Sequence, residues 1–260
     1  MSIGVFDSGI GGLSVLRALR AELPHEDFIY IADSANAPYG ERDDEHVIAR
    51  SRALAADLVG QGAKALVVAC NTATAAAIHV LRAEYPNLPI VGVEPALKPA
   101  LLSSKTRRIG VMATRGTLAS AKFKALLAPL QGEAELVLQA CDGLADAIEQ
   151  QVAIGDSSRV AALCASHVGA MGQFGTGDGE IDTLVLGCTH YPFAQAHLLQ
   201  LLGPDVTFIE TGEPVARRTR QLLQERGLLK HSEAEGSIQL QSSGDAAALQ
   251  AAARQWLLLR

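Results

Sequence analysis

The feature of this sequence that most limits its fold is the alternation of short, β-branched apolar runs with longer segments of helical spacing. The runs expected to form strands are 3–6, 28–31, 65–69, 90–93, 108–112 and 183–186. The segments expected to form helices are 13–22, 45–59 and 72–84, and residues 237–258 are expected to add a strand and an Ala-rich helix. Such alternation is typical of parallel sheets covered by helices, so we expect an α/β fold.

The order of these segments starts again in the second part of the chain. Residues 108–112 resemble 2–6, and residues 183–189 resemble 65–71. Two matches in the same order predict a duplicated unit, that is, two pseudo-symmetric α/β domains, although two short apolar runs can also coincide by chance. Residues 172–179 are Gly-rich and polar, and are expected to form a loop.

Composition excludes several classes of protein. The 48% of hydrophobic residues excludes a disordered chain, and four scattered cysteines do not make a disulfide framework. The 22 Lys and Arg residues are outnumbered by 28 Asp and Glu residues and form no basic run, so no nucleic-acid partner is expected. No signal peptide and no apolar stretch of membrane-spanning length is recognised. We therefore expect a cytoplasmic protein with reduced thiols and no membrane partner.

Two cysteines occupy equivalent places in the two repeats. Cys70 and Cys188 each follow an apolar run and precede a polar residue, Asn71 or Thr189, that could start a helix. This is the carboxyl edge of a parallel sheet, where ligands bind and a helix N-terminus favours a thiolate. A single cysteine there would more often be a packing residue. Two equivalent cysteines favour thiols that reach one cleft from opposite sides.

Facing thiols suit a reaction that inverts a carbon centre. One thiolate can remove a proton from carbon while the opposite thiol delivers a proton to the other face, without metal or cofactor. A zinc site is disfavoured because Cys188 and His190 form a C-x-H pair with no second close pair, and no C-x-x-C is present. Cys141 and Cys164 lack the setting at a strand end and are expected to be packing residues.

The loop Asp7-Ser8-Gly9-Ile10-Gly11-Gly12 allows a backbone to approach a ligand closely at the start of a helix. A dinucleotide site is one interpretation, with Asp33 as the ribose-binding acid. Against it, Ser14 stands at the third glycine of that fingerprint, and Asp7 would place negative charge beside a pyrophosphate. Asp7 is then either a helix N-cap or a carboxylate that orients or deprotonates a thiol or binds a substrate ammonium.

Other polar residues have a structural and a functional interpretation each. Ser8, Asn71, Thr72 and Thr189 could cap helices, or could together hold the carboxylates of a substrate without Arg or Lys. His190 could be a general acid, a core histidine or a cap, and its position two residues after Cys188 favours the first. Tyr39 and Gly40 follow Pro38 in an expected turn.

Four motifs in this order resemble the glutamate racemases of the cofactor-independent aspartate/glutamate racemase superfamily. The motifs are Ile3-Gly4-Val5-Phe6-Asp7-Ser8-Gly9-Ile10-Gly11-Gly12, Ala37-Pro38-Tyr39-Gly40, Val68-Ala69-Cys70-Asn71-Thr72-Ala73 and Leu186-Gly187-Cys188-Thr189-His190-Tyr191-Pro192. The resemblance extends to Ser243-Gly244-Asp245. It implies two domains, residues 1–97 with 210–260 and residues 98–209, and an active site between them. It also implies interconversion of L- and D-glutamate for peptidoglycan synthesis, no cofactor and a homodimer.

The resemblance also implies roles for single residues. Cys70 matches the thiol that takes the α-proton from D-glutamate, and Cys188 matches the thiol that takes it from L-glutamate. Asp7 matches the acid near the first thiol and His190 the histidine near the second. Substrate contacts fall on Asp7, Ser8, Tyr39, Gly40, Asn71, Thr72, Thr189 and His190. Glu149 is the candidate for a further catalytic glutamate, although the chain has Cys141-Asp142 where many members have Cys-Pro.

Two other functions stay open at this stage. The chain could be an aspartate racemase, or another acid racemase or decarboxylase, because thiol chemistry tolerates several substrates. It could instead be a nucleotide-binding regulatory module that uses its glycine loop. Some glutamate racemases carry an N-terminal extension through which a cell-wall precursor activates them. Because the first strand is expected at Ile3, we expect no such activation here.

Overall fold

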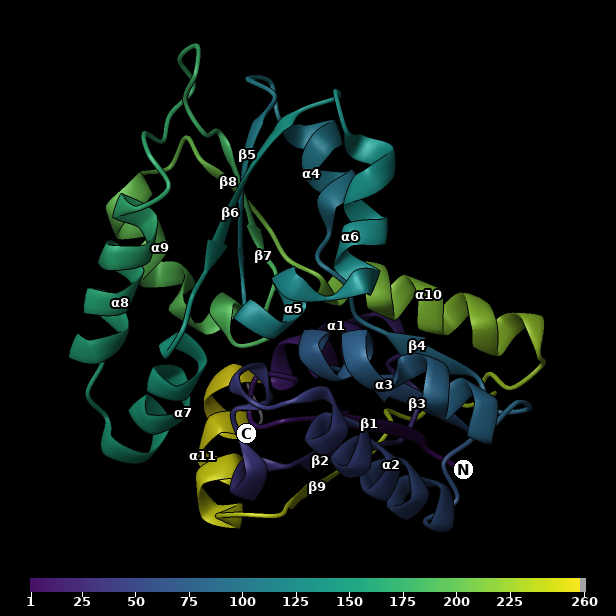
Figure 1. The fold of residues 1–260 in the computed structure, drawn as a ribbon. Helices are drawn as coiled ribbons and strands as arrows, with labels where there is room; N and C mark the ends of the chain where they lie inside the picture. Colours follow the sequence, from purple (N-terminus) through teal and green to yellow (C-terminus); the bar gives the residue numbers. More distant parts are fainter. Residues whose placement is uncertain (258–260) are drawn as a thin grey trace.

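Two parallel sheets organise the protein (Figure 1). The computed structural model describes residues 1–257; residues 258–260, assigned above to the first domain, lie outside the described part. The first sheet has the order β4-β3-β1-β2-β9, with bounds Ile90–Gly92, Ala65–Val68, Ile3–Asp7, Phe28–Ala32 and Ile238–Ser242. The second has the order β6-β5-β7-β8, with bounds Glu135–Ala140, Arg108–Ala113, Thr183–Leu186 and Thr207–Ile209. This confirms the predicted fold class.

The two sheets share one topology. Read from the opposite edge, the second sheet runs β8-β7-β5-β6, which matches β4-β3-β1-β2 of the first, and β9 is an additional strand. The registers agree as well, since Phe6 pairs with Val68 as Met112 pairs with Leu186. The strand β8 belongs to the second sheet and β9 to the first. The exact boundaries between the two domains stay a prediction.

Helices cover both faces of each sheet. They are α1 Leu13–Glu22, α2 Asp44–Gly60, α3 Asn71–Glu84, α4 Leu97–Ser103, α5 Arg115–Ala119, α6 Ala121–Leu127, α7 Leu144–Ile154, α8 Ser158–Gly169, α9 Gln195–Leu202, α10 Gly212–Glu225 and α11 Ala246–Trp256. Short 3-10 turns are η1 Ser34–Asn36, η2 Tyr39–Glu41, η3 Ala128–Leu130 and η4 Tyr191–Ala194. Figure 1 shows α8 and α9 on one side of the second sheet and α4 and α6 on the other.

Local sequence explains where these helices begin and end. In α1, Leu13, Leu16 and Leu19 form a buried stripe at three-residue spacing, and the helix stops before Pro24. Asp245 caps α11 by accepting hydrogen bonds from the first turn, at 2.8 Å from Ala247 N. The expected strands and helices appear within a residue or two of their predicted bounds.

The helix expected directly after Cys188 differs from the prediction. It begins at Tyr191 as η4 and continues as α9, after a turn in which Tyr191 N donates to Cys188 O at 3.1 Å. Pro192, which has no N–H to donate, suits the first turn of such a helix. Within residues 1–257 we find no helix with both the length and the apolarity needed to cross a bilayer.

Candidate active site

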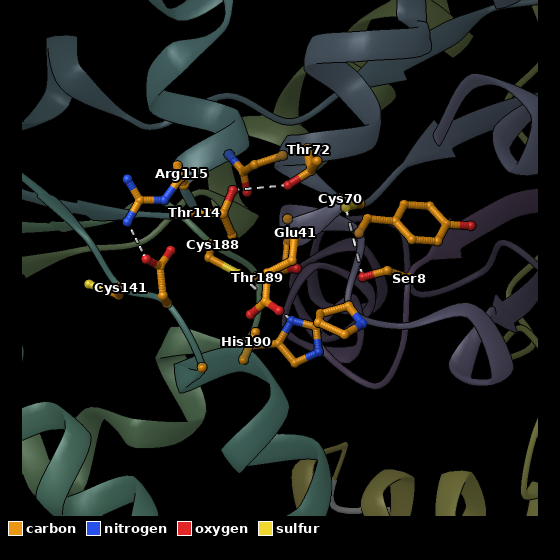
Figure 2. A pocket seen from close by; sticks show the side chains of 17 residues that line it. Ser8, Glu41, Cys70, Thr72, Thr114, Arg115, Cys141, Cys188, Thr189 and His190 are labelled. Atoms are coloured by element: carbon orange, nitrogen blue, oxygen red, sulfur yellow. Dashed lines mark hydrogen bonds and ion pairs between the residues drawn. The ribbon is translucent and has the colours of Figure 1, made fainter. Parts of the chain in front are cut away.

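A cavity lies between the carboxyl ends of the two sheets, the edge at which parallel α/β sheets bind small molecules. Ser8 and Cys70 reach it from the ends of β1 and β3, and Thr114 and Cys188 from the ends of β5 and β7. Figure 2 shows Cys70 and Ser8 on one side of the cavity and Cys188, Thr189 and His190 toward the other. The duplicated fold therefore brings its two strand-end cysteines to one cavity.

On the first side, Cys70 is linked to Asp7 through a serine. The Cys70 thiol lies 3.9 Å from Ser8 Oγ, and Ser8 Oγ lies 3.3 Å from Asp7 Oδ1. Cys70 is itself the N-cap of α3, because its Sγ accepts from Ala73 N at 3.4 Å. Burial, followed by the charge of Asp7, raises the pKa of the Cys70 thiol, against smaller opposing effects of the Ala73 and Ser8 donors.

Asp7 lies behind the cavity, fully buried between the two halves. Its carboxylate accepts hydrogen bonds from Gly9 N at 2.7 Å and from Thr189 Oγ1 at 2.9 Å. Burial raises the pKa of Asp7 to about 6, although His190 and these donors favour the charged form. The N-cap of α1 is Gly12, so Asp7 does not cap that helix. Its carboxylate instead lies behind Ser8, which links it to the Cys70 thiol.

On the second side, Cys188 is linked to a charged pair. Cys188 Sγ lies 3.8 Å from His190 Nδ1, and His190 Nε2 lies 2.6 Å from Glu149 Oε1. Burial disfavours a charged imidazole, but Cys188 and Glu149 outweigh burial and raise the pKa of His190. The two thiols thus have opposite surroundings, an anion near Cys70 and a cation near Cys188.

The glycine loop holds carboxylates from the protein itself. Ile10 N donates to Glu149 Oε1 at 2.7 Å, in addition to the bond from Gly9 N to Asp7. A Cβ on Gly9 would lie 1.8 Å from Glu149 Oε1, and one on Gly11 would lie 2.3 Å from His190 Nδ1. The glycines are required because the second half packs directly on this loop. That packing occupies the space a pyrophosphate would need, which argues against the dinucleotide interpretation.

The remaining polar side chains of the cavity leave hydrogen-bonding capacity for a ligand. Asn71 is 3% exposed, yet neither its Nδ2 nor its Oδ1 has a partner among the described residues. Thr72 Oγ1 lies 3.0 Å from Thr114 Oγ1, across the junction of the two halves. A buried amide without a partner is costly, so Asn71 points to a bound polar group. Within residues 1–257, no cluster of three His, Cys, Asp or Glu side chains could hold a metal.

The structure brings all the predicted site residues together. Those that line the cavity are Ser8, Tyr39, Gly40, Cys70, Asn71, Thr72, Cys188, Thr189 and His190. Asp7 and Glu149 lie behind it and act on its lining through hydrogen bonds. Because the helix α3 begins at Asn71 with Cys70 as its cap, Asn71 and Thr72 are not capping residues.

The cavity is also lined by residues for which the sequence predicted no functional role. Thr114, Arg115, Cys141 and Asp142 line it, and Arg115 forms an ion pair with Asp142. The prediction that Cys141 lacks a strand-end setting is wrong, because Cys141 directly follows β6. Cys164, by contrast, is buried inside α8 as a packing residue.

A sequence signal for these missed positions exists in the duplication. At the ends of the paired strands, Asp7 pairs with Ala32 in the first sheet and Ala113 pairs with Ala140 in the second. Asp7 is thus equivalent to Ala113. The next residues, Ser8 and Thr114, are therefore equivalent too. By the same registers, Cys141 corresponds to Asp33. Extending the repeat by one residue past each strand would have found both positions.

Comparison with known proteins agrees with this geometry. The Asp/Glu/Hydantoin racemase family matches residues 3–219. The chain belongs to this family. It is 50% identical to a glutamate racemase of Stutzerimonas stutzeri over 89% of this chain and 85% of the relative. Membership makes the protein an isomerase of the amino-acid racemase class.

Solved structures of the same family have the same two-sheet fold. A glutamate racemase isoform of Bacillus anthracis superposes with a TM-score of 0.86 at 33% identity, covering 100% of this chain and 94% of the other. A glutamate racemase of Francisella tularensis, solved in complex with D-glutamate, gives a TM-score of 0.80 at 26% identity, covering 100% and 94%. The resemblance found in the sequence motifs is thereby confirmed.

Proposed function

We propose that this racemase interconverts L-glutamate and D-glutamate by two-base proton transfer between Cys70 and Cys188. The observation that carries the proposal is the pair of thiols at equivalent strand ends of two matching sheets, lining one cavity. The substrate is inferred from relatives named glutamate racemase that are similar over most of their length. No cofactor is part of the proposed reaction.

In the direction from L to D, the Cys188 thiolate takes the α-proton of L-glutamate. The electron pair of the broken C–H bond remains on Cα, delocalised into the α-carboxylate. The Cys70 thiol then gives its proton to the opposite face of Cα, which completes the inversion. After this step Cys188 is a thiol and Cys70 a thiolate, which is the state from which D-glutamate is processed in reverse.

The surroundings of the two thiols support this division of labour. His190 lies 3.8 Å from Cys188 Sγ and is held by Glu149 at 2.6 Å, which places a cation beside the base proposed for L-glutamate. To act on D-glutamate, Cys70 must first lose its proton. Ser8 offers a path, since its Oγ can accept from Cys70 while its own hydroxyl donates to Asp7 Oδ1.

Recognition of glutamate is proposed to use neutral groups at helix starts. Asn71, the hydroxyls of Thr72 and Thr114, and the first N–H groups of α3 can bind carboxylates without a cation. The unpartnered amide of Asn71 supports this, because a bound carboxylate or ammonium would satisfy it.

The cellular role follows from the family resemblance. We propose that the enzyme supplies D-glutamate for peptidoglycan synthesis and cell wall biogenesis in the cytoplasm, as a homodimer. Light scattering on the purified protein tests the dimer.

The experiment that tests the function is a racemisation assay on purified, cofactor-free protein. L-glutamate and L-aspartate are offered in parallel and the loss of circular dichroism is followed. Glutamate should be turned over at least about tenfold better, since one methylene is worth about 1–3 kcal/mol to a pocket. Preference for aspartate would establish the second candidate, an aspartate racemase, and inactivity with both would contradict the proposal.

A further inference from the structure

Asp33 is a buried carboxylate that the proposed chemistry does not use. It directly follows β2, is 0% exposed, and lies outside the lining of the cavity. Its two oxygens accept hydrogen bonds from Arg50 Nε at 2.9 Å, Arg50 Nη2 at 2.8 Å, Tyr39 Oη at 2.5 Å and Asn36 Nδ2 at 3.0 Å. A ribose-binding acid would present free oxygens to a ligand, whereas these oxygens are engaged within the protein.

The Arg50 guanidinium makes this burial possible. Burial alone would raise the pKa of Asp33, but the hydrogen bonds from Arg50, followed by that from Tyr39, outweigh it and lower the pKa. The contact is bidentate, which fixes both the distance and the plane of the pair. Asp33 is therefore a charged, rigid acceptor held from α2.

The group that this acceptor holds is part of the cavity wall. Tyr39 is 1% exposed, and residues 38–41 line the cavity. The next residue, Gly40, packs against the second half of the protein, where an added Cβ would lie 2.8 Å from Thr114 Cβ. Fixing Tyr39 thus fixes the segment that closes the cavity against Thr114.

We propose that Asp33 and Arg50 are positioning residues, which hold Tyr39 Oη and thereby set the segment 38–41 at the distance from Thr114 that glutamate binding requires. This inference rests on the proposed function. Neither residue touches the thiols, so their loss weakens substrate binding far more than it slows proton transfer.

The test compares Tyr39→Phe, Arg50→Met and the double variant with a matched control, Arg52→Met. Arg52 lies on the same helix and pairs with Glu84 at 2.6 Å, with 58% of its side chain exposed. In racemisation assays, Tyr39→Phe and Arg50→Met should each raise KM for glutamate about tenfold and change kcat less than about threefold. Arg52→Met should leave both unchanged. Because Arg50 acts through Tyr39, the double variant should raise KM no further than the larger single effect.

Several results would overturn the inference. The first is an unchanged KM in Tyr39→Phe. The second is a loss in Tyr39→Phe or Arg50→Met that lowers kcat and leaves KM unchanged. The third is a KM in the double variant that rises by the product of the two single effects. If Arg50→Met leaves Asp33 uncompensated and does not fold, Tyr39→Phe, which keeps the ion pair, decides alone. Failure of the proposed function is distinguishable, because wild type and Arg52→Met would then also fail to racemise glutamate, and this inference would fall with it.

Discussion

Asp7 is a fully buried carboxylate whose ionisation costs the folded protein free energy. Its pKa rises from 3.8 to about 6 on folding, because burial outweighs the favourable effect of His190 and of its hydrogen-bond donors. At about 1.4 kcal/mol for each pKa unit, the ionised carboxylate destabilises the folded protein by about 3 kcal/mol above pH 6. The folded state binds more protons than the unfolded state between about pH 4 and 6. The free energy of unfolding therefore falls as the pH rises through this window.

Asp7→Asn removes this cost, because the amide has the same shape and no charge. Its oxygen can still accept from Gly9 N and its Nδ2 can donate to Thr189 Oγ1, but the Thr189 hydroxyl proton loses its carboxylate acceptor, which subtracts about 1 kcal/mol. The net gain is about 2 kcal/mol at pH 8, or about 4–8 °C in Tm for a chain of this size. At pH 4 the gain disappears, since wild-type Asp7 is then protonated in the folded state. Racemisation of D-glutamate should fall about 10²-fold, because the amide cannot take the proton of Cys70.

Thermal unfolding at pH 4 and pH 8, with racemisation kinetics on the same samples, measures both effects. Asp182→Asn is a matched control, for which we expect the opposite effect on the free energy of unfolding. Burial would raise the pKa of Asp182, but donors including Ser104 Oγ outweigh it and lower the pKa, so this variant should lose stability at pH 8. The reasoning is refuted if Asp7→Asn is no more stable than wild type at pH 8, or if its advantage is the same at both pH values.

Two further predictions concern the proton paths on either side of the cavity. Ser8→Ala interrupts the link from Cys70 to Asp7. The kcat for D-glutamate should therefore fall about 10²-fold, while the midpoint of thermal unfolding changes little. A kcat within twofold of wild type would contradict proton transfer through Ser8. Glu149→Gln keeps an acceptor for Ile10 N but removes the charge that helps raise the pKa of His190. His190 then loses its proton earlier as the pH rises. The decline of kcat/KM for L-glutamate with rising pH should therefore begin at a lower pH than in wild type. A pH profile that does not move would show that Glu149 does not control this charge.

The strand-end cysteines could be predicted from the sequence because their signal is local. Cys70 and Cys188 follow clean apolar runs whose residues are buried on both faces, as in the interior of a parallel sheet. Cys141 was missed because β6 is an edge strand with partly exposed residues, so its run Glu135–Ala140 mixes polar and apolar side chains.

Contacts between distant segments could not be predicted in the same way. Position 9 needs a glycine because the Glu149 carboxylate approaches it too closely for a Cβ. Asp33 is paired with Arg50, which lies on the following long helix, α2. No periodicity or spacing encodes such contacts, because they depend on how the two halves and their loops pack. The sequence resemblance identified Glu149 as a candidate, and the structure supplies its geometry, a hydrogen bond of 2.6 Å to His190.

The central claim is that each thiol serves one enantiomer. Exchange of the α-proton in deuterated water, followed by NMR for Cys70→Ser and Cys188→Ser with each enantiomer separately, tests it most directly. Cys70→Ser should exchange the α-proton of L-glutamate but not of D-glutamate, Cys188→Ser should do the reverse, and neither should racemise either substrate at more than about 1% of the wild-type rate. A single variant that racemises like wild type, or that exchanges both enantiomers equally, would contradict the assignment.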